Sequence, residues 1–244
     1  MLRYSSFLTL ILWCCIAAVG QASSGAGASG DKNFAAEARL AELTLAAHGG
    51  QKFREMQSLI VSGSVEITTS AFPQAIPASF VTIFAGEKYR LEINNPFQPL
   101  KQAYDGTQTV SSLPGGFTLP PINRLGLPIL QQLGKQGFIV TPLPEEKKKK
   151  RGFRMTSPEG FFTDFYLEDK TDKIRSYDAT YVMSGRTVTT SVEIDKLRLV
   201  DGVLLPEKYA QRFNTEQFTV YASFKAKDIV VNSAVKDTVF KTLE

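Results

Sequence analysis

The stretch Thr187–Phe213, TVTTSVEIDKLRLVDGVLLPEKYAQRF, decides the fold class. Apolar and polar side chains alternate along most of it, and the pair Asp201-Gly202 interrupts the alternation. A period of two is typical of a half-buried β-strand, and Asp-Gly is a strong signal for a tight turn between strands. The stretch therefore predicts two antiparallel strands, Thr187–Leu199 and Leu204–Phe213.

The same alternation extends over most of the chain from Ser58 onward. Further strands are expected near residues 58–67, 79–84, 88–93, 101–104, 107–112, 138–141, 153–156, 161–167, 173–178 and 218–228. Short strands at spacings of about 8–12 residues, with turn residues between them, are typical of an antiparallel sandwich or barrel. The sequence therefore predicts a mainly β protein.

A helix is expected before the first strand, from Asp31 to about Ala47. Asp31 is a suitable N-cap, and Gly49-Gly50 can end the helix because glycine accepts the left-handed conformation. A stripe of apolar residues at helical spacing predicts the inward face: Ala36, Leu40, Leu43 and Ala47.

The segment Leu113–Gly137 follows neither pattern. It combines four prolines with many apolar side chains, and prolines at this density do not fit a central strand. Leu127–Leu133 is expected to form a short helix with Pro128 in its first turn. Such an apolar segment must lie on an apolar surface.

The first 22 residues are typical of a cleaved secretory signal, with Arg3 before the apolar run Phe7–Val19. That run is too short for a membrane span of about 20 residues, although an uncleaved N-terminal anchor is the alternative. Residues 23–32 predict a flexible linker, and residues 33–244 a single domain. Cys14 and Cys15 are the only cysteines, so the cleaved product has no thiol for a disulfide or a metal.

Catalytic patterns are scarce. The one histidine, His48, stands at the expected helix end and predicts a surface or capping residue, so neither a Ser-His-Asp triad nor a zinc site can be assembled. Paired carboxylates are the remaining possibility for an enzyme. Their alternative interpretation, solvent-facing charges that protect strands from aggregation, is favoured for all four candidates: Asp164, Glu168, Glu193 and Asp195. We therefore expect no enzyme, no cofactor and no metal.

A basic run covers Lys147, Lys148, Lys149, Lys150 and Arg151. It predicts either a solvated hairpin loop or a contact for anionic lipid headgroups or an acidic partner protein. Nucleic acid is not expected, because the net charge is only +4 and the chain is predicted to be exported.

Apolar surface is the remaining signal, with 17 phenylalanines and 8 tyrosines. A curled sheet covered by an apolar flap can form a pocket for an acyl chain, and each buried methylene contributes about 0.8 kcal/mol. The expected cavity residues are Leu40, Leu43, Leu59, Val61, Val65, Phe80, Phe84, Tyr89, Leu91, Phe117, Leu125, Ile129, Leu133, Phe161 and Phe165.

Four stretches in this order resemble the periplasmic outer-membrane lipoprotein carrier and sorting superfamily (LolA/LolB-like): Ala46–Ile67, Gly86–Leu91 with Tyr104–Thr107, Leu199–Pro206, and Ile229–Asn232 with Val235, Asp237 and Phe240. The resemblance implies a half-open antiparallel β-barrel of about ten strands, closed by helices, whose apolar interior holds acyl chains. The helix from Asn33 to Ala47 and the segment Phe117–Gly137 would then form the lid.

One feature departs from that family. Its best-known carriers have an Arg-Pro pair before the third-strand aromatic residue, where the arginine latches the lid, and this chain has Ala85-Gly86 there. The sequence does not say whether Arg90 or Arg124 takes that role.

The leading hypothesis is a monomeric periplasmic carrier or binder of a lipid or lipoprotein acyl group, with inner- or outer-membrane proteins as further partners. A non-enzymatic cell-envelope assembly or interaction module is the alternative, and an unrecognised hydrolase comes third.

Overall fold

The computed structural model describes residues 34–70, 74–97, 99–113, 118, 119, 121–183, 186–214 and 219–243. The predicted signal and linker, Asp31 and Phe117 lie outside these ranges. Among the described residues, no helix combines the length and the apolar character needed to cross a bilayer.

Twelve strands are present within the described ranges, and they form one antiparallel sheet. Their bounds are β1 (Ser58–Thr69), β2 (Ile76–Ala85), β3 (Lys88–Asn94), β4 (Leu100–Tyr104), β5 (Thr109–Ser111), β6 (Ile139–Thr141), β7 (Gly152–Thr156), β8 (Phe162–Leu167), β9 (Ile174–Met183), β10 (Arg186–Val200), β11 (Val203–Asn214) and β12 (Thr219–Val231).

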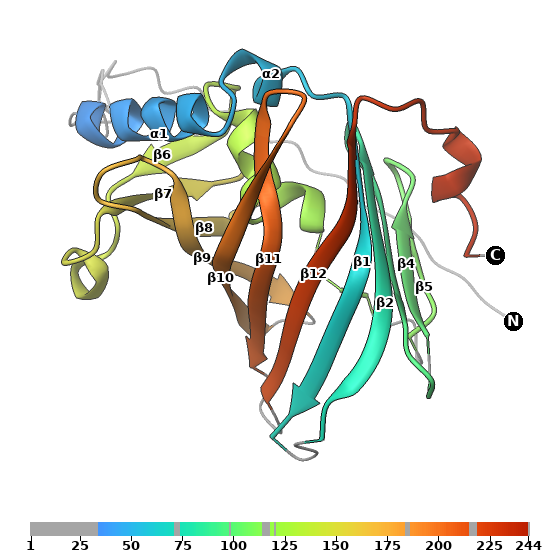
Figure 1. Ribbon diagram of the computed structural model, residues 1–244. Coiled ribbons are helices and arrows are strands. Elements are labelled where there is room, and N and C mark those ends of the chain that lie inside the picture. Colours follow the sequence, from blue (N-terminus) through green and yellow to red (C-terminus); the bar gives the residue numbers. More distant parts are fainter. Residues whose placement is uncertain are drawn as a thin grey trace, which may run out of the picture. The chain divides into compact units, whose positions relative to one another are not determined.

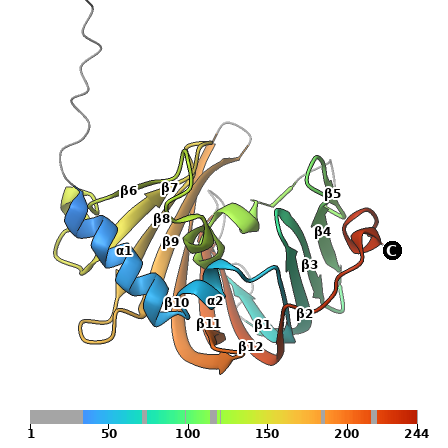
Figure 2. The same cartoon turned by 90° about the horizontal axis from the view of Figure 1, so that it is seen from above.

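The strand order is β5-β4-β3-β2-β1-β12-β11-β10-β9-β8-β7-β6. The first and last strands pair with each other in the middle, whereas β5 and β6 form the two edges. The sheet curls but stays open between these edges (Figures 1 and 2). The predicted fold class, a half-open antiparallel barrel, is confirmed, with twelve strands instead of about ten.

The proline-rich segment joins the two edge strands in sequence, and its described part from residue 121 onward lies at the open side of the sheet. Its regular parts are two 3-10 helices, η2 (Ile122–Arg124) and η3 (Leu127–Gln132), with Pro128 in the first turn of η3. Figure 2 shows them between the two arms of the curled sheet. We call residues 121–137 the lid segment.

The N-terminal helix α1 (Ala35–Ala47) packs near β6 and β7, and the one-turn helix α2 (Gln51–Arg54) follows the glycine pair. The predicted inward stripe is wrong at Ala36 and Leu43, which are exposed, whereas Leu40 does pack against the core. The fully buried residues of the helix are Ala41, Thr44 and Leu45. Thr44 tolerates burial because its hydroxyl donates to the carbonyl of Leu40 at 2.9 Å. The buried face is therefore shifted around the helix.

His48 is fully buried, so its assignment to the surface is also wrong. Its ring lies between the backbones of β11 and β9, contacting the carbonyl of Leu204 and the amide of Ile174. Gly49 has φ +122°, and a Cβ there would lie 2.6 Å from the carbonyl oxygen of Gly202. Glycine is required at this position because two backbones approach closely.

Candidate functional site: an apolar cavity beneath the lid

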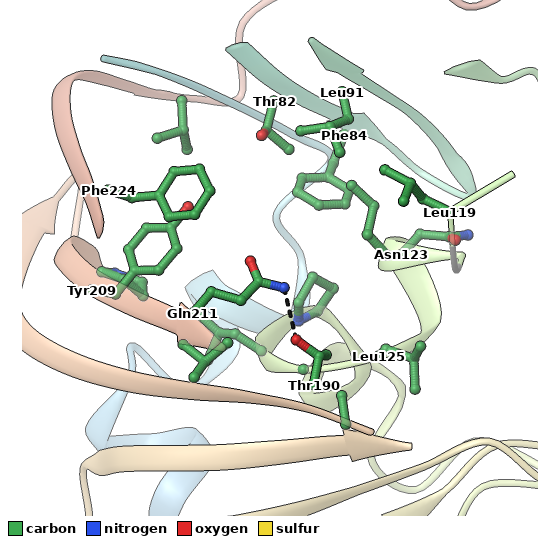
Figure 3. A pocket seen from close by; sticks show the side chains of 18 of the residues that line it. Thr82, Phe84, Leu91, Leu119, Asn123, Leu125, Thr190, Tyr209, Gln211 and Phe224 are labelled. Carbon is green, nitrogen blue, oxygen red and sulfur yellow. Dashed lines mark hydrogen bonds between the residues drawn. The ribbon is translucent and has the colours of Figure 1, made fainter. Parts of the chain in front are cut away.

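A cavity of about 840 Å³ lies between the concave face of the sheet and the lid segment. Figure 3 shows side chains from both arms of the sheet and from the lid converging on it. Of the described residues that line this cavity, none carries a charge. The cavity is therefore suited to an uncharged, mostly apolar ligand.

The register of β9 to β12 and β1 explains one wall. Tyr177, Val192, Gln211, Ala222 and Ile67 are successive cross-strand partners, so they form one row across five strands. Because side chains alternate between faces, every second residue of these strands joins the same concave surface. The neighbouring row also lines the cavity and contains Ala179, Thr190, Phe213 and Val220.

The opposite wall comes from β2 and β3, where Thr82, Phe84 and Leu91 face the cavity (Figure 3). Deeper in the curl, Tyr209 stacks on Phe224 with a centroid distance of 4.7 Å and an interplanar angle of 9°. Such aromatic pairs contribute about 0.5–1.5 kcal/mol beyond the burial of their area, and both rings line the cavity.

The lid segment is attached to the sheet and to α2 by hydrogen bonds. The amide of Gly126 donates to Oγ1 of Thr163 at 2.9 Å. Nε2 of Gln131 donates to the carbonyls of Phe53 at 2.9 Å and Met56 at 3.1 Å. The lid is thus a fastened part of the fold and not a loosely packed loop.

Two further contacts join the lid to the β2–β3 turn. Nδ2 of Asn123 donates to the carbonyl of Glu87 at 2.7 Å, and the Arg124 guanidinium lies 3.3 Å from the Glu87 carboxylate. Arg124 also pairs with Glu159. Arg90 instead donates to the carbonyl of Val239 at 2.8 Å. Of the two arginines considered from the sequence, Arg124 is the one that binds the lid to this turn.

Five of the predicted cavity residues are among the lining side chains: Leu59, Val61, Phe84, Leu91 and Leu125. Six others are buried in the protein's own core and do not line the cavity: Val65, Phe80, Tyr89, Ile129, Leu133 and Phe165. Phe161 packs beside Leu125 and Tyr181, Leu40 packs against the main core, and Leu43 is exposed.

The sequence reasoning missed the lining residues of β9 to β12. The signal was present, because the alternating positions of Leu204–Phe213 include Leu205, Tyr209, Gln211 and Phe213, all of which line the cavity.

A few polar groups interrupt the apolar lining. Nε2 of Gln211 donates to Oγ1 of Thr190 at 3.0 Å, as Figure 3 shows. Tyr181 is 2% exposed, and its hydroxyl has no hydrogen-bond partner among the described residues. Burial raises the pKa of Tyr181, so its hydroxyl stays protonated at any physiological pH.

The carboxylate candidates lie away from the cavity. Glu168, Glu193 and Asp195 are exposed, as expected. Asp164 is fully buried, so its prediction as a solvent-facing charge is wrong. Its carboxylate accepts from Nε of Arg154 at 2.6 Å and from Nζ of Lys147 at 2.9 Å, and these cations satisfy it.

The basic run folds over this part of the sheet. Lys147 also reaches Asp178 at 2.9 Å, and Nζ of Lys150 lies 4.3 Å from the centroid of the Tyr166 ring. Lys148 pairs with Glu145, Arg151 pairs with Asp172, and Lys149 is exposed. Most of the run's charge is therefore engaged within the fold.

The described residues also contain no group of three or more His, Cys, Asp or Glu side chains that could hold a metal ion. The arrangement can enclose hydrocarbon, with a few hydrogen-bonding side chains beside it.

No protein-family model matches this chain, and no curated protein sequence matches it. Solved structures do. A DUF1329 family protein from Desulfovibrio piger aligns with 11% identity and a TM-score of 0.49, over 84% of this chain and 96% of the other. A LolA superfamily protein from Nitrosomonas europaea aligns with 10% identity and a TM-score of 0.49, over 81% and 96%.

A third structure is a domain from Vibrio parahaemolyticus assigned to the outer membrane lipoprotein-sorting proteins. It has 9% identity and a TM-score of 0.47, with 85% of this chain and 97% of the other covered.

Proposed function

We propose that this protein is an exported, non-enzymatic carrier that holds the acyl part of a lipid or lipoprotein in the cavity beneath the lid segment. The observation that carries the proposal is an apolar cavity of about 840 Å³ with no charged residue among its described lining. Pockets for small molecules span about 300–1,000 Å³, so the cavity is large enough for a long hydrocarbon chain.

The energetics favour such a ligand. A buried methylene contributes about 0.8 kcal/mol, so a long acyl chain gains on the order of 10 kcal/mol before the costs of association. The gain needs no polar contact, which agrees with a wall made of residues such as Val61, Phe84 and Val192. A charged headgroup would remain outside, because nothing in the described lining compensates a buried charge.

The lid gives the carrier a way to load and release. It contributes Leu125, Leu127 and Pro128 to the cavity wall, so its displacement would open the hydrocarbon site to a membrane or a partner. A periplasmic protein that moves acyl chains between membranes needs this property, and the predicted signal peptide would bring it there.

The test compares two positions that are neighbours in β12. Ala222→Trp places a large ring in the cavity, whereas Tyr221→Trp changes a side chain that is 50% exposed. Both variants are checked by circular dichroism and then titrated with a fluorescent fatty-acyl probe. We expect wild type and Tyr221→Trp to bind the probe and Ala222→Trp to bind at least tenfold more weakly.

Mass spectrometry of the natively purified protein supplies a second readout. A co-purified lipid in the wild type that is absent from Ala222→Trp supports the proposal. If folded wild type neither retains a lipid nor takes up the acyl probe, the carrier function is wrong.

A further inference from the structure

The hydrogen bonds around Gln211 fix the direction of its side-chain amide. Oγ1 of Thr190 has one hydrogen, and it donates this hydrogen to the carbonyl of Arg212 at 3.1 Å. The same oxygen must therefore act as acceptor toward Gln211, whose Nε2 lies 3.0 Å away. The amide nitrogen thus faces Thr190, and the amide oxygen is the free end.

That free end lies in the apolar cavity. Gln211 occupies the centre of the concave row, between Val192 on β10 and Ala222 on β12. No hydrogen bond from the described residues reaches its Oε1. Figure 3 shows the side chain in the space between the two walls. The cavity therefore presents a hydrogen-bond acceptor part way along a mostly apolar surface.

A plain hydrocarbon chain would remove water from this oxygen and return no hydrogen bond. A ligand hydroxyl can donate its hydrogen to such an acceptor. Tyr181 also lines the cavity, but it lies on β9, two strands away from β11, and its hydroxyl is fully buried, so a ligand does not reach it.

We propose that the ligand is a hydroxylated acyl chain, whose hydroxyl donates a hydrogen bond to Oε1 of Gln211. This inference rests on the proposed carrier function and narrows its substrate class. A site built to hydrogen-bond a hydroxyl discriminates strongly against the analogue that lacks it, because the analogue leaves the site's polar group unpaired.

The experiment uses the full mature chain and displacement of a fluorescent acyl probe. The competitors are hexadecanoic acid, monohydroxy derivatives with the hydroxyl near the head, middle or tail, and the matching oxo derivatives. We expect at least one hydroxy acid to bind about tenfold more tightly than hexadecanoic acid, which corresponds to about 1.4 kcal/mol. The oxo acids gain nothing, because a ketone cannot donate to Gln211.

Three variants locate the effect. Gln211→Met keeps the side-chain size without the amide and should abolish the preference while hexadecanoic acid binds as well as before. Tyr181→Phe removes a hydroxyl that the ligand does not reach and should leave the preference unchanged. The control Tyr221→Phe removes a hydroxyl from an exposed position of β12 and should leave it unchanged.

The outcomes separate the two proposals. If all acids bind wild type equally, or if Gln211→Met keeps the preference, the hydroxyl inference is wrong and the carrier function stands. If no acid binds at all, both fail.

Discussion

Nδ1 of His48 lies 2.9 Å from the carbonyl oxygen of Leu204, although 156 positions separate the two residues in the sequence. A carbonyl can only accept, so Nδ1 carries the proton and donates. Nε2 then accepts from the amide of Ile174 at 3.1 Å. These two bonds require the neutral imidazole, and they fix the end of α1 to β11 and β9.

The first prediction concerns pH. Burial lowers the pKa of His48 from its ordinary value of 6.5. Just below pH 6.5, His48 is therefore protonated in the unfolded chain but still neutral in the folded protein. Stability is therefore complete above about pH 6.5 and declines as the pH falls below it, by up to about 1.4 kcal/mol per pH unit. Urea unfolding between about pH 7 and pH 5 measures this decline.

The variant His48→Gln is the control for the decline in stability between about pH 7 and pH 5. Glutamine does not titrate, so the variant should be less stable at neutral pH but nearly independent of pH down to about pH 5. Carboxylates with lowered pKa, such as Asp178, lose their contribution only at more acidic pH. An equally steep decline in both proteins would assign the effect to other groups.

The second prediction concerns Asp164. Asp164→Ala leaves Arg154 and Lys147 without their shared carboxylate, although both cations keep partial contact with water, at 25% and 28% side-chain exposure. Breaking a buried pair costs about 3–5 kcal/mol, and the partial exposure reduces this to about 2–3 kcal/mol. Chemical denaturation measures the loss.

The comparison variant for Asp164 is Glu193→Ala, because Glu193 is an exposed carboxylate in the same sheet. It should change stability by less than about 0.5 kcal/mol. Similar effects of the two substitutions would mean that burial does not distinguish these carboxylates.

The strands were predictable from the sequence because alternation is a local property that each strand carries alone. Pairing of β1 with β12 is not local, and only the resemblance to a family implied the half-open barrel. The buried face of α1 was misplaced because Thr44 and His48 are polar, and their burial depends on partners that hydropathy does not reveal.

The cavity itself was harder to predict. Whether an inward-facing side chain packs in the core or lines the cavity depends on which side chains lie opposite it. Val65 and Val61 share a face of β1, yet only Val61 lines the cavity, whereas Val65 packs in the core beside Phe224. No property of the two valines themselves separates them, because the difference depends on which side chains lie opposite each one.

The third prediction concerns Gly126. Its φ is +64°, and a Cβ there would lie 2.7–2.9 Å from ring atoms and the hydroxyl of Tyr177. Gly126→Ala therefore combines backbone strain with a clash against a buried ring, and we expect a loss of about 2–4 kcal/mol. Urea unfolding measures it, and uptake of the acyl probe should become faster because the lid is loosened.

The control variant Gly160→Ala introduces backbone strain without a steric clash. Gly160 has φ +82°, but a Cβ there would meet nothing within 4 Å. This control should cost about 1–2 kcal/mol and leave probe uptake unchanged. Equal losses for both variants would show that the Tyr177 ring gives way without cost.

The fourth prediction concerns the contact between Arg124 and Glu87. Arg124 is 28% exposed and Glu87 is 53% exposed, so Arg124→Gln should cost less than about 1 kcal/mol of global stability. Its effect should appear in kinetics, because the pair joins the lid to the β2–β3 turn. We expect stopped-flow uptake and release of the acyl probe to accelerate several-fold, with an unchanged equilibrium affinity.

Two controls identify the interaction as electrostatic and specific to the lid. Lys88→Gln removes a similarly exposed pair, with Asp237, which is not part of the lid, so probe kinetics should stay at the wild-type rate. High salt should accelerate uptake by wild type but not by Arg124→Gln, because screening weakens only a charge pair that is still present. If Arg124→Gln and wild type exchange the probe at the same rate at low salt, this contact does not hold the lid, and the hydrogen bond from Asn123 to Glu87 becomes the next one to remove.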